Sequence, residues 1–181
     1  MEHMFMPLKR YADFSGRSRR MEFWMWVLFQ FLLGLVFAIL VVAIGGAAML
    51  SQDATGMVAA GGAALIFYGL WGLCSLAFFI PNLAVTVRRL HDTNRSGWWI
   101  MLFWGPYLLA LALTVMAAAS LAGGAGAAEG SAVLGMLGGL LSILSIVGSL
   151  VLLVFMFIDG TPGPNDYGSD PKQRDASHVF A

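Results

Sequence analysis

The sequence predicts an all-α integral membrane protein, a four-helix transmembrane bundle with both the N- and the C-terminus in the cytoplasm. Hydrophobic residues make up 59% of the 181 residues and charged residues only 11%, whereas soluble domains average about 45–50% and about 25%. So few charges do not cover a water-exposed surface, which excludes a soluble globular protein. The same hydrophobicity excludes intrinsic disorder. With a net charge of zero, nucleic-acid binding has no electrostatic driving force.

The charged residues lie outside four long apolar runs. No Asp, Glu, Lys or Arg occurs in 23–52, 54–87, 97–128 or 130–158. Each run exceeds the about 20 apolar residues that a helix needs to cross the hydrocarbon core. Because backbone groups in lipid need internal hydrogen-bond partners, each run is predicted to be a helix. We place the helices, in chain order, at about 23–50, 57–87, 98–121 and 133–158. They form one domain over 23–158, between an N-terminal segment 1–22 and a tail 159–181, with a loop at 88–97.

The first run is too long for a signal peptide, whose apolar region has about 7–15 residues, so we expect a retained helix. The second run, 57–87, has 31 residues and would reach about 46 Å, too long for an upright span. Proline has no N–H and clashes with the preceding turn. We therefore expect Pro81 to divide this helix, with 82–92 emerging into the headgroups, and Pro106 to kink the third helix.

The distribution of basic residues predicts the orientation. All ten Lys and Arg lie in the N-terminal segment (five), the 88–97 loop (three) and the tail (two). With four spans, these three segments share one side of the membrane, and the positive-inside rule makes that side the cytoplasm. Four tryptophans stand where two spans meet this side and are predicted to be interfacial anchors: Trp24, Trp26, Trp98 and Trp99.

The fourth helix carries a stripe of small residues at spacings of three and four. Such stripes let two helix backbones approach closely in lipid. Two interpretations stay open: packing against a neighbouring helix of the same chain, or an interface between copies of the chain. The predicted packing residues are Gly135, Gly139, Ser142, Ser145 and Ser149.

Three polar motifs gather on the predicted cytoplasmic side. The first, GRSRRMEFW, spans 16–24; the second, RRLHDTNRSGWW, spans 88–99; the third, DGTPGPNDYGSDP, spans 159–171. These motifs, in this order around four spans, resemble domain-of-unknown-function family 805 of bacterial inner-membrane proteins. The resemblance covers about 14–171 and implies fold and location but no activity. One departure is Asp166, which stands where the family pattern has a basic residue.

The arginines of these motifs suit bidentate contacts with phosphate or carboxylate. Three roles stay open: topology and lipid contact, a structural lock between helix ends, and a true ligand site. In the structural lock, Arg88 and Arg89 would pair with Glu22, Asp92 and Asp159. The candidate binding residues are Arg17, Arg19, Arg20, Arg88, Arg89, His91, Asp92 and Arg95. The candidate structural cluster is Glu22, Asn94, Ser96, Asp159, Asn165, Tyr167 and Asp170. We expect Ser96 to cap the third helix and Gly97 to adopt an unusual backbone angle.

No metal site, cofactor or catalytic residue is predicted. His91 and Asp92 supply two ligands, whereas a catalytic zinc takes about three from the protein. His91 is expected to be an interfacial residue, with proton transfer as the alternative.

The predicted function is therefore a non-enzymatic interaction or assembly module of the bacterial inner membrane. Its arginine-rich face would contact anionic lipid headgroups or a membrane protein partner, and a homo-oligomer is compatible with it. No Asp, Glu, Lys, Arg or His lies within a span, which disfavours a transporter. Two alternatives are kept: a small oligomeric transporter with Gln30, Asn82 and the fourth-helix serines as its polar lining, and an interfacial enzyme that acts on lipid headgroups through His91 and Asp92.

Overall fold

A computed structural model describes residues 2–51, 54–122 and 128–172. Its elements, in order, are α1 (Glu2–Lys9), α2 (Arg20–Ser51), α3 (Ala54–Asp92), the 3-10 helix η1 (Gly97–Ile100), α4 (Met101–Ala122) and α5 (Ala128–Phe157). Four segments are long and apolar enough to cross a membrane: Arg20–Gly46, Gly61–Asp92, Gly97–Leu121 and Gly130–Phe157. Within the described ranges there is no strand, only an isolated bridge between Asn165 and Gly168. The all-α membrane fold is confirmed.

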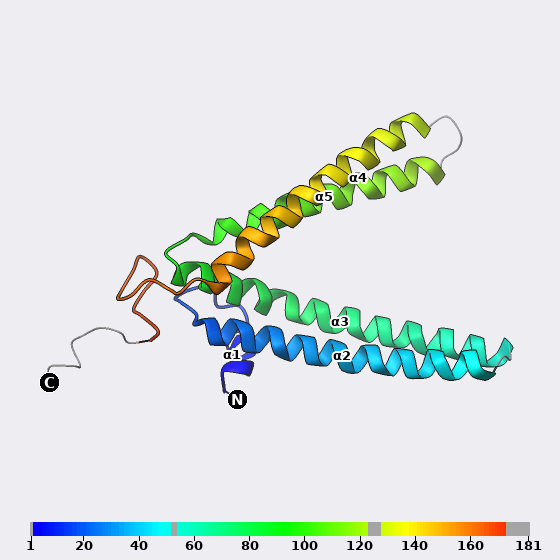
Figure 1. The fold of residues 1–181 in the computed structure, drawn as a ribbon, viewed down its shortest axis with the longest axis horizontal. Coiled ribbons are helices and arrows are strands. Elements are labelled where there is room, and N and C mark those ends of the chain that lie inside the picture. The colour runs from blue at the N-terminus through cyan, green and yellow to red at the C-terminus, as the bar shows by residue number, and fades with distance from the viewer. Residues whose placement is uncertain (1, 52–53, 123–127, 173–181) are drawn as a thin grey trace.

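The four long helices are arranged as two hairpins, α2 with α3 and α4 with α5. The hairpins meet at one end of the molecule and diverge toward the other, as Figure 1 shows. Helix α1, the turn between α3 and η1, and the described part of the tail after α5 lie at the meeting end (Figure 1). The three arginine-bearing segments therefore share one end, as predicted; which side of the membrane this end faces stays a prediction of the positive-inside rule.

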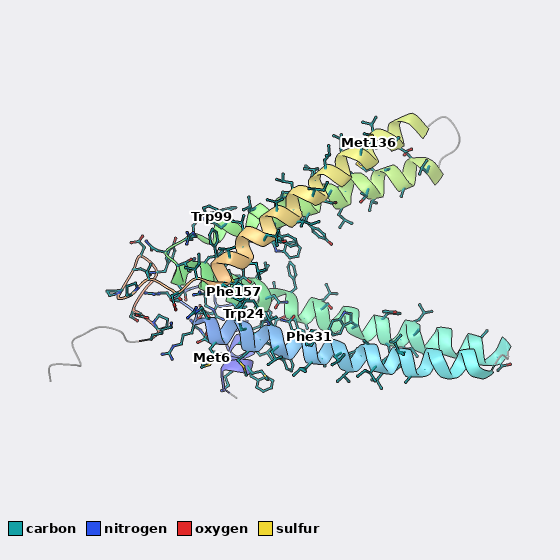
Figure 2. The ribbon with its side chains drawn as sticks, in the orientation of Figure 1. Met6, Trp24, Phe31, Trp99, Met136 and Phe157 are labelled. Atoms are coloured by element: carbon teal, nitrogen blue, oxygen red, sulfur yellow. The ribbon has the colours of Figure 1, made fainter. Side chains whose placement is uncertain are left out.

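The apolar core lies where the hairpins meet. Trp24 of α2 lies against Phe157 of α5, with ring centroids 4.5 Å apart, and Figure 2 shows both at this junction. Phe79 of α3 meets Trp104 of α4 edge to face. The buried core residues are Leu90, Ile100, Leu152, Phe155 and Met156. Beyond this junction the two helices of each hairpin pack mainly against each other. Their outward apolar side chains are exposed, as expected of side chains that face lipid.

Pro81 does not divide α3, so that prediction is wrong. The helix runs through the proline to Asp92. A proline at position 81 leaves the carbonyl of Ala77, four residues earlier, without its helical N–H donor. The Tyr11 hydroxyl, from the segment after α1, donates to this carbonyl at 2.6 Å. An outside donor that satisfies the freed carbonyl lets a membrane helix continue past a proline.

Pro106 likewise lies inside α4 without ending it. The carbonyl that this proline leaves free belongs to Leu102. It lies against Gly148 of α5, where any Cβ would collide with it. Ser145 of α5 donates to the neighbouring carbonyl of Phe103 at 3.2 Å. The second hairpin therefore packs most closely around the break that Pro106 makes in the hydrogen bonding of α4.

The small residues of α5 divide into two sets. Ser145 lies buried in the contact with α4, and so do Gly138 and Gly148. Gly135 and Gly139 have open space where a Cβ would stand. Ser142 and Ser149 donate to carbonyls of their own helix. The closest approach to α4 thus falls on the Gly138 and Gly148 side of the helix.

Polar residues also join the two helices of the first hairpin. Gln30 of α2 and Asn82 of α3 exchange hydrogen bonds at 2.8 and 3.1 Å. The Trp26 indole N–H donates to the same Asn82 oxygen at 2.6 Å. Trp26 is buried and is not an interfacial anchor, whereas Trp98 is 78% exposed. Trp26 is buried because its N–H finds a partner inside the hairpin.

Candidate functional site

The candidate site is the arginine-rich end, which we define as residues 10–22, 88–97 and 158–172. Its segments are the residues before α2 with the start of that helix, the end of α3 with the turn that follows, and the tail after α5. In Figure 1 they lie together where the hairpins meet. Its polar side chains are held by contacts between residues that are far apart in the sequence.

Asp92 is the centre of this end. Its carboxylate accepts from Arg17 Nε at 3.0 Å and from Arg89 Nη1 at 2.5 Å. All three side chains are at most 3% exposed. Its backbone carbonyl accepts from the Thr161 amide at 2.9 Å. One residue at the end of α3 therefore joins the N-terminal segment, the helix itself and the tail.

Arg17 holds the tail against the end of α3. Its Nη2 donates to the Thr161 carbonyl at 2.6 Å and its Nη1 to the Gly163 carbonyl at 2.7 Å, while Nε is paired with Asp92. A guanidinium carries five N–H donors in a fixed planar fork, which suits several fixed acceptors at once. Arg17 is therefore used structurally, to order the turns of the tail.

Two further arginines bind the free carbonyls at the end of α5. Arg89 Nη2 donates to the Ile158 carbonyl, and Arg20 Nη1 donates to the Phe157 carbonyl at 2.9 Å. The last carbonyls of a helix have no partner within it and carry partial negative charge. The two cations thus cap α5 and tie it to α2 and α3.

Surface ion pairs lie around this buried centre. Asp159 pairs with Arg20 at 2.7 Å and with Lys172 at 2.8 Å. Arg19 donates to the Pro171 carbonyl. Asp159 therefore pairs with Arg20. Among the described residues, the predicted pairing of Arg89 is seen with Asp92.

The tail folds back on the end of α3 through turns. The Asn165 amide donates to the His91 carbonyl at 2.9 Å, and the Tyr167 ring stacks on the His91 ring at 3.9 Å. Gly163 has a φ of 74°, a region that favours glycine. Gly160 has no room for a Cβ, because the Asp92 carboxylate occupies that space. Buried Asp170 accepts from the Gly163 and Lys172 amides.

The turn between α3 and η1 differs from prediction in two details. Ser96 stands at the N-cap position, but its side chain makes no capping hydrogen bond. The left-handed residue is Asn94, with a φ of 56°, rather than Gly97. Gly97 lies in a tight contact instead: a Cβ there would stand 3.0 Å from a Val87 methyl group, so Val87 would have to shift. Arg95 lies over the Phe155 ring at 4.0 Å, a cation–π contact.

The segment after α1 carries an exposed ion pair between Arg10 and Asp13. Asp13 accepts hydrogen bonds from the Ser15 hydroxyl at 2.5 Å and from Arg10 Nε at 2.8 Å. These hydrogen bonds, with Ser15 the larger influence, hold the pKa of Asp13 well below its usual range. The sequence analysis did not predict α1, which packs on α2 and α3.

Arg88 is the exception among the arginines. It is fully buried, and Nε, Nη1 and Nη2 have no hydrogen-bond partner in the part of the chain that the structure describes. The carboxylate of Glu22 attracts its charge, but that carboxylate accepts from the Ser18 hydroxyl at 2.6 Å. The predicted pairing of Arg88 with an acidic residue is therefore not seen among the described residues.

The candidate residues thus form one interconnected end, with Arg88 buried inside it. Residues that sequence reasoning missed are Tyr11, Ser18, Gly160 and Thr161. Gly160 and Thr161 belong to the quoted tail motif, but nothing in the pattern indicated contact with Asp92. Among the described residues, no three His, Cys, Asp or Glu side chains lie close enough together to hold a metal ion.

Four membrane-length helices and a folded polar end define a multi-pass helical membrane protein. The chain belongs to the family described as "Protein of unknown function (DUF805)", whose model matches residues 11–169. It is 31% identical to the inner membrane protein YhaI of Escherichia coli over 95% of this chain and 97% of the relative. It is also 31% identical to the inner membrane protein YhaH of the same organism, over 95% and 98%.

A third relative, the uncharacterized protein YiiR of Escherichia coli, is 31% identical over 87% of this chain and 85% of its own length. No solved structure matches the chain. The family and the four spans make the protein a multi-pass inner membrane protein.

Proposed function

We propose that this protein is a non-enzymatic interaction module of the inner membrane, and that its arginine-rich end recognises anionic groups at the cytoplasmic surface. The observation that carries this proposal is the use of the buried arginines. Arg17 and Arg89 bind the chain's own carbonyls and Asp92. The end is therefore a fixed platform rather than a loose set of charged loops.

Partly exposed arginines and exposed tryptophans lie at the edge of the platform and form the recognition surface, which we define as Arg19, Arg20, Arg95, Trp98 and Trp99. Trp98 is 78% exposed, which suits a side chain at the level of lipid headgroups. The Arg20 side chain is 40% exposed. Each basic residue near an anionic leaflet gains about 1 kcal/mol. A fixed platform with arginines and tryptophans at its edge suits attachment to anionic lipid or to an acidic membrane partner.

The positions of His91 and Asp92 support a non-enzymatic role. His91 Nδ1 lies 3.2 Å from the Gly16 carbonyl, and its ring is covered by Tyr167. Both Asp92 carboxylate oxygens are paired with arginines. Neither residue is in a position to transfer a proton to a lipid headgroup without breaking these contacts.

Native mass spectrometry of the gently solubilised full chain tests the proposal. The wild type is expected to retain anionic phospholipid, or a partner chain, at fixed stoichiometry. The variant Arg20→Gln/Arg95→Gln should lose it, whereas Lys9→Gln, outside the recognition surface, should keep it. Equal spectra of a bare protein from the wild type and the double variant would refute the proposal.

A further inference from the structure

Arg88 is the least compensated charge in the described part of the chain. The side chain is fully buried, and all three guanidinium nitrogens lack a hydrogen-bond partner. The one other buried side-chain nitrogen or oxygen without a partner among the described residues is Nε of Arg89, whose remaining nitrogens are bonded. A buried cation without partners costs several kcal/mol. The site therefore lacks an acceptor group.

The acidic side chains nearby are engaged elsewhere. Glu22 and Asp13 attract the Arg88 charge, and Arg10 repels it. Asp13 is bound by Arg10 and Ser15, and Glu22 by Ser18. No ion pair joins Arg88 to any of them in the described structure. The carboxylates of Glu22 and Asp13 thus attract the Arg88 charge, but no oxygen of the described chain accepts a hydrogen bond from its guanidinium.

The position of Arg88 indicates the kind of acceptor. It lies near the end of α3, one residue before Arg89 and four before Asp92. This end carries the exposed Trp98, the side chain typical of the headgroup level. Phosphate groups are the anions that a bilayer holds at this level, and a guanidinium fork binds two phosphate oxygens at once.

We propose that Arg88 is a binding site for a phosphate group, supplied either by a phospholipid headgroup or by free phosphate. The charges of Arg10 and Asp13 act on Arg88, and both side chains are more than a third exposed. Their segment is therefore the route by which the phosphate would enter. The Ser18 amide donates to the Arg88 carbonyl at 3.1 Å, and the Ser18 hydroxyl donates to Glu22, whose charge acts on Arg88.

This site names a ligand class for the arginine-rich end and in that sense rests on the proposed function. It differs from the recognition surface in being buried, so the two are altered by different variants. Arg88→Gln removes the guanidinium. Glu22→Gln removes the carboxylate that opposes an incoming anion while the guanidinium stays. Lys9→Gln is the control, because it removes one positive charge from α1.

The experiment measures the thermal unfolding midpoint of the full chain in neutral detergent while a probe is titrated. The probes are a short-chain phosphatidylglycerol and inorganic phosphate, with sodium chloride at matched ionic strength as the blank. For the wild type and Lys9→Gln we expect a saturable rise of about 5–10 °C at about one hundred times Kd. Arg88→Gln should show no rise, and Glu22→Gln should bind about tenfold more tightly.

The probes distinguish the source of the phosphate. A response to phosphatidylglycerol alone assigns the site to a lipid headgroup, and an equal response to inorganic phosphate assigns it to the free ion. The proposal is overturned if Arg88→Gln responds like the wild type, or if neither the wild type nor Glu22→Gln responds. If Arg88→Gln does not fold, the affinity of Glu22→Gln for the probe decides instead: tighter binding than in the wild type supports the site, and unchanged binding overturns it.

The two proposals fail separately. If Arg20→Gln/Arg95→Gln loses its retained lipid or partner while the phosphate response does not depend on Arg88, the recognition surface stands and the buried site does not. If the phosphate response depends on Arg88 and the surface variant retains everything that the wild type does, the buried site stands alone.

Discussion

Asp92→Asn is the change that best tests the account of the arginine-rich end. Asp92 and its partners Arg17 and Arg89 have side chains at most 3% exposed. An asparagine keeps the shape of the side chain but loses the charge and one acceptor oxygen. It therefore leaves one buried guanidinium without a carboxylate oxygen and both without a neutralising charge. Removing one partner from a buried ion pair costs about 3–5 kcal/mol.

For a chain of this length each kcal/mol lowers the unfolding midpoint by about 2–4 °C, so Asp92→Asn should lower it by about 6–20 °C. Tryptophan fluorescence during thermal unfolding in detergent measures this, because Trp24 and Trp99 contact Phe157 and Phe155 at the junction.

The matched control is Asp13→Asn. Asp13 pairs with Arg10 three residues away, as Asp92 pairs with Arg89, but its side chain is 38% exposed. Exposed pairs contribute about 0–1 kcal/mol. The two variants change the same residue type in the same spacing and differ in burial. If Asp92→Asn lowered the midpoint no more than Asp13→Asn, the central role of Asp92 would be wrong.

Three further predictions concern the helices and the N-terminal segment. Tyr11→Phe leaves the Ala77 carbonyl without a donor; we expect a loss of about 1–3 kcal/mol and faster amide exchange around residue 81, and unchanged exchange would contradict this. Gly148→Ala should destabilise by about 1–3 kcal/mol in the same unfolding assay, since its Cβ meets a backbone carbonyl of α4. Gly139→Ala, in open space, should gain about 0.5–1 kcal/mol; equal losses would refute the packing. The folded pKa of Asp13 lies below the unfolded value of about 3.9. Its contribution to stability, at most about 1 kcal/mol, is therefore present above that pH and is lost as the pH falls through the lower folded value. A stability difference between wild type and Asp13→Asn that grew in acid would contradict this prediction.

The prediction that Pro81 divides the helix failed for a reason that is physical rather than statistical. The sequence shows that Pro81 removes one backbone hydrogen bond, and this loss is local. Whether the helix then breaks depends on a donor elsewhere, and that donor is the Tyr11 hydroxyl, 66 residues away. At Pro106 the outcome depends on Gly148 of another helix, which leaves room for the Leu102 carbonyl.

The sequence predicted which types of charged residue meet, but not which arginine binds which partner. The motifs indicated that arginines and carboxylates meet at one end, and Arg89 with Asp92 was among the pairs considered. That Arg17 reaches the carbonyls of Thr161 and Gly163 left no signal in the sequence, because backbone acceptors look the same in every residue. Arg88 and Arg89 are adjacent and have the same side chain. Because they point in different directions from α3, Arg89 is bonded to Asp92 and Arg88 has no hydrogen-bond partner among the described residues.

The sequence by itself determined the number of spans, the helical class, the family and the gathering of all three polar motifs at one end. These follow from the length and hydrophobicity of each segment and from the placement of charges, which are properties of the chain read in order. The tertiary structure alone decided that the helices pair as two hairpins joined at that end, that Asp92 is its centre and that Arg88 is buried without a partner. Those outcomes depend on contacts between residues such as Arg17 and Thr161, 144 positions apart, whose meeting is fixed by packing and burial rather than by local pattern.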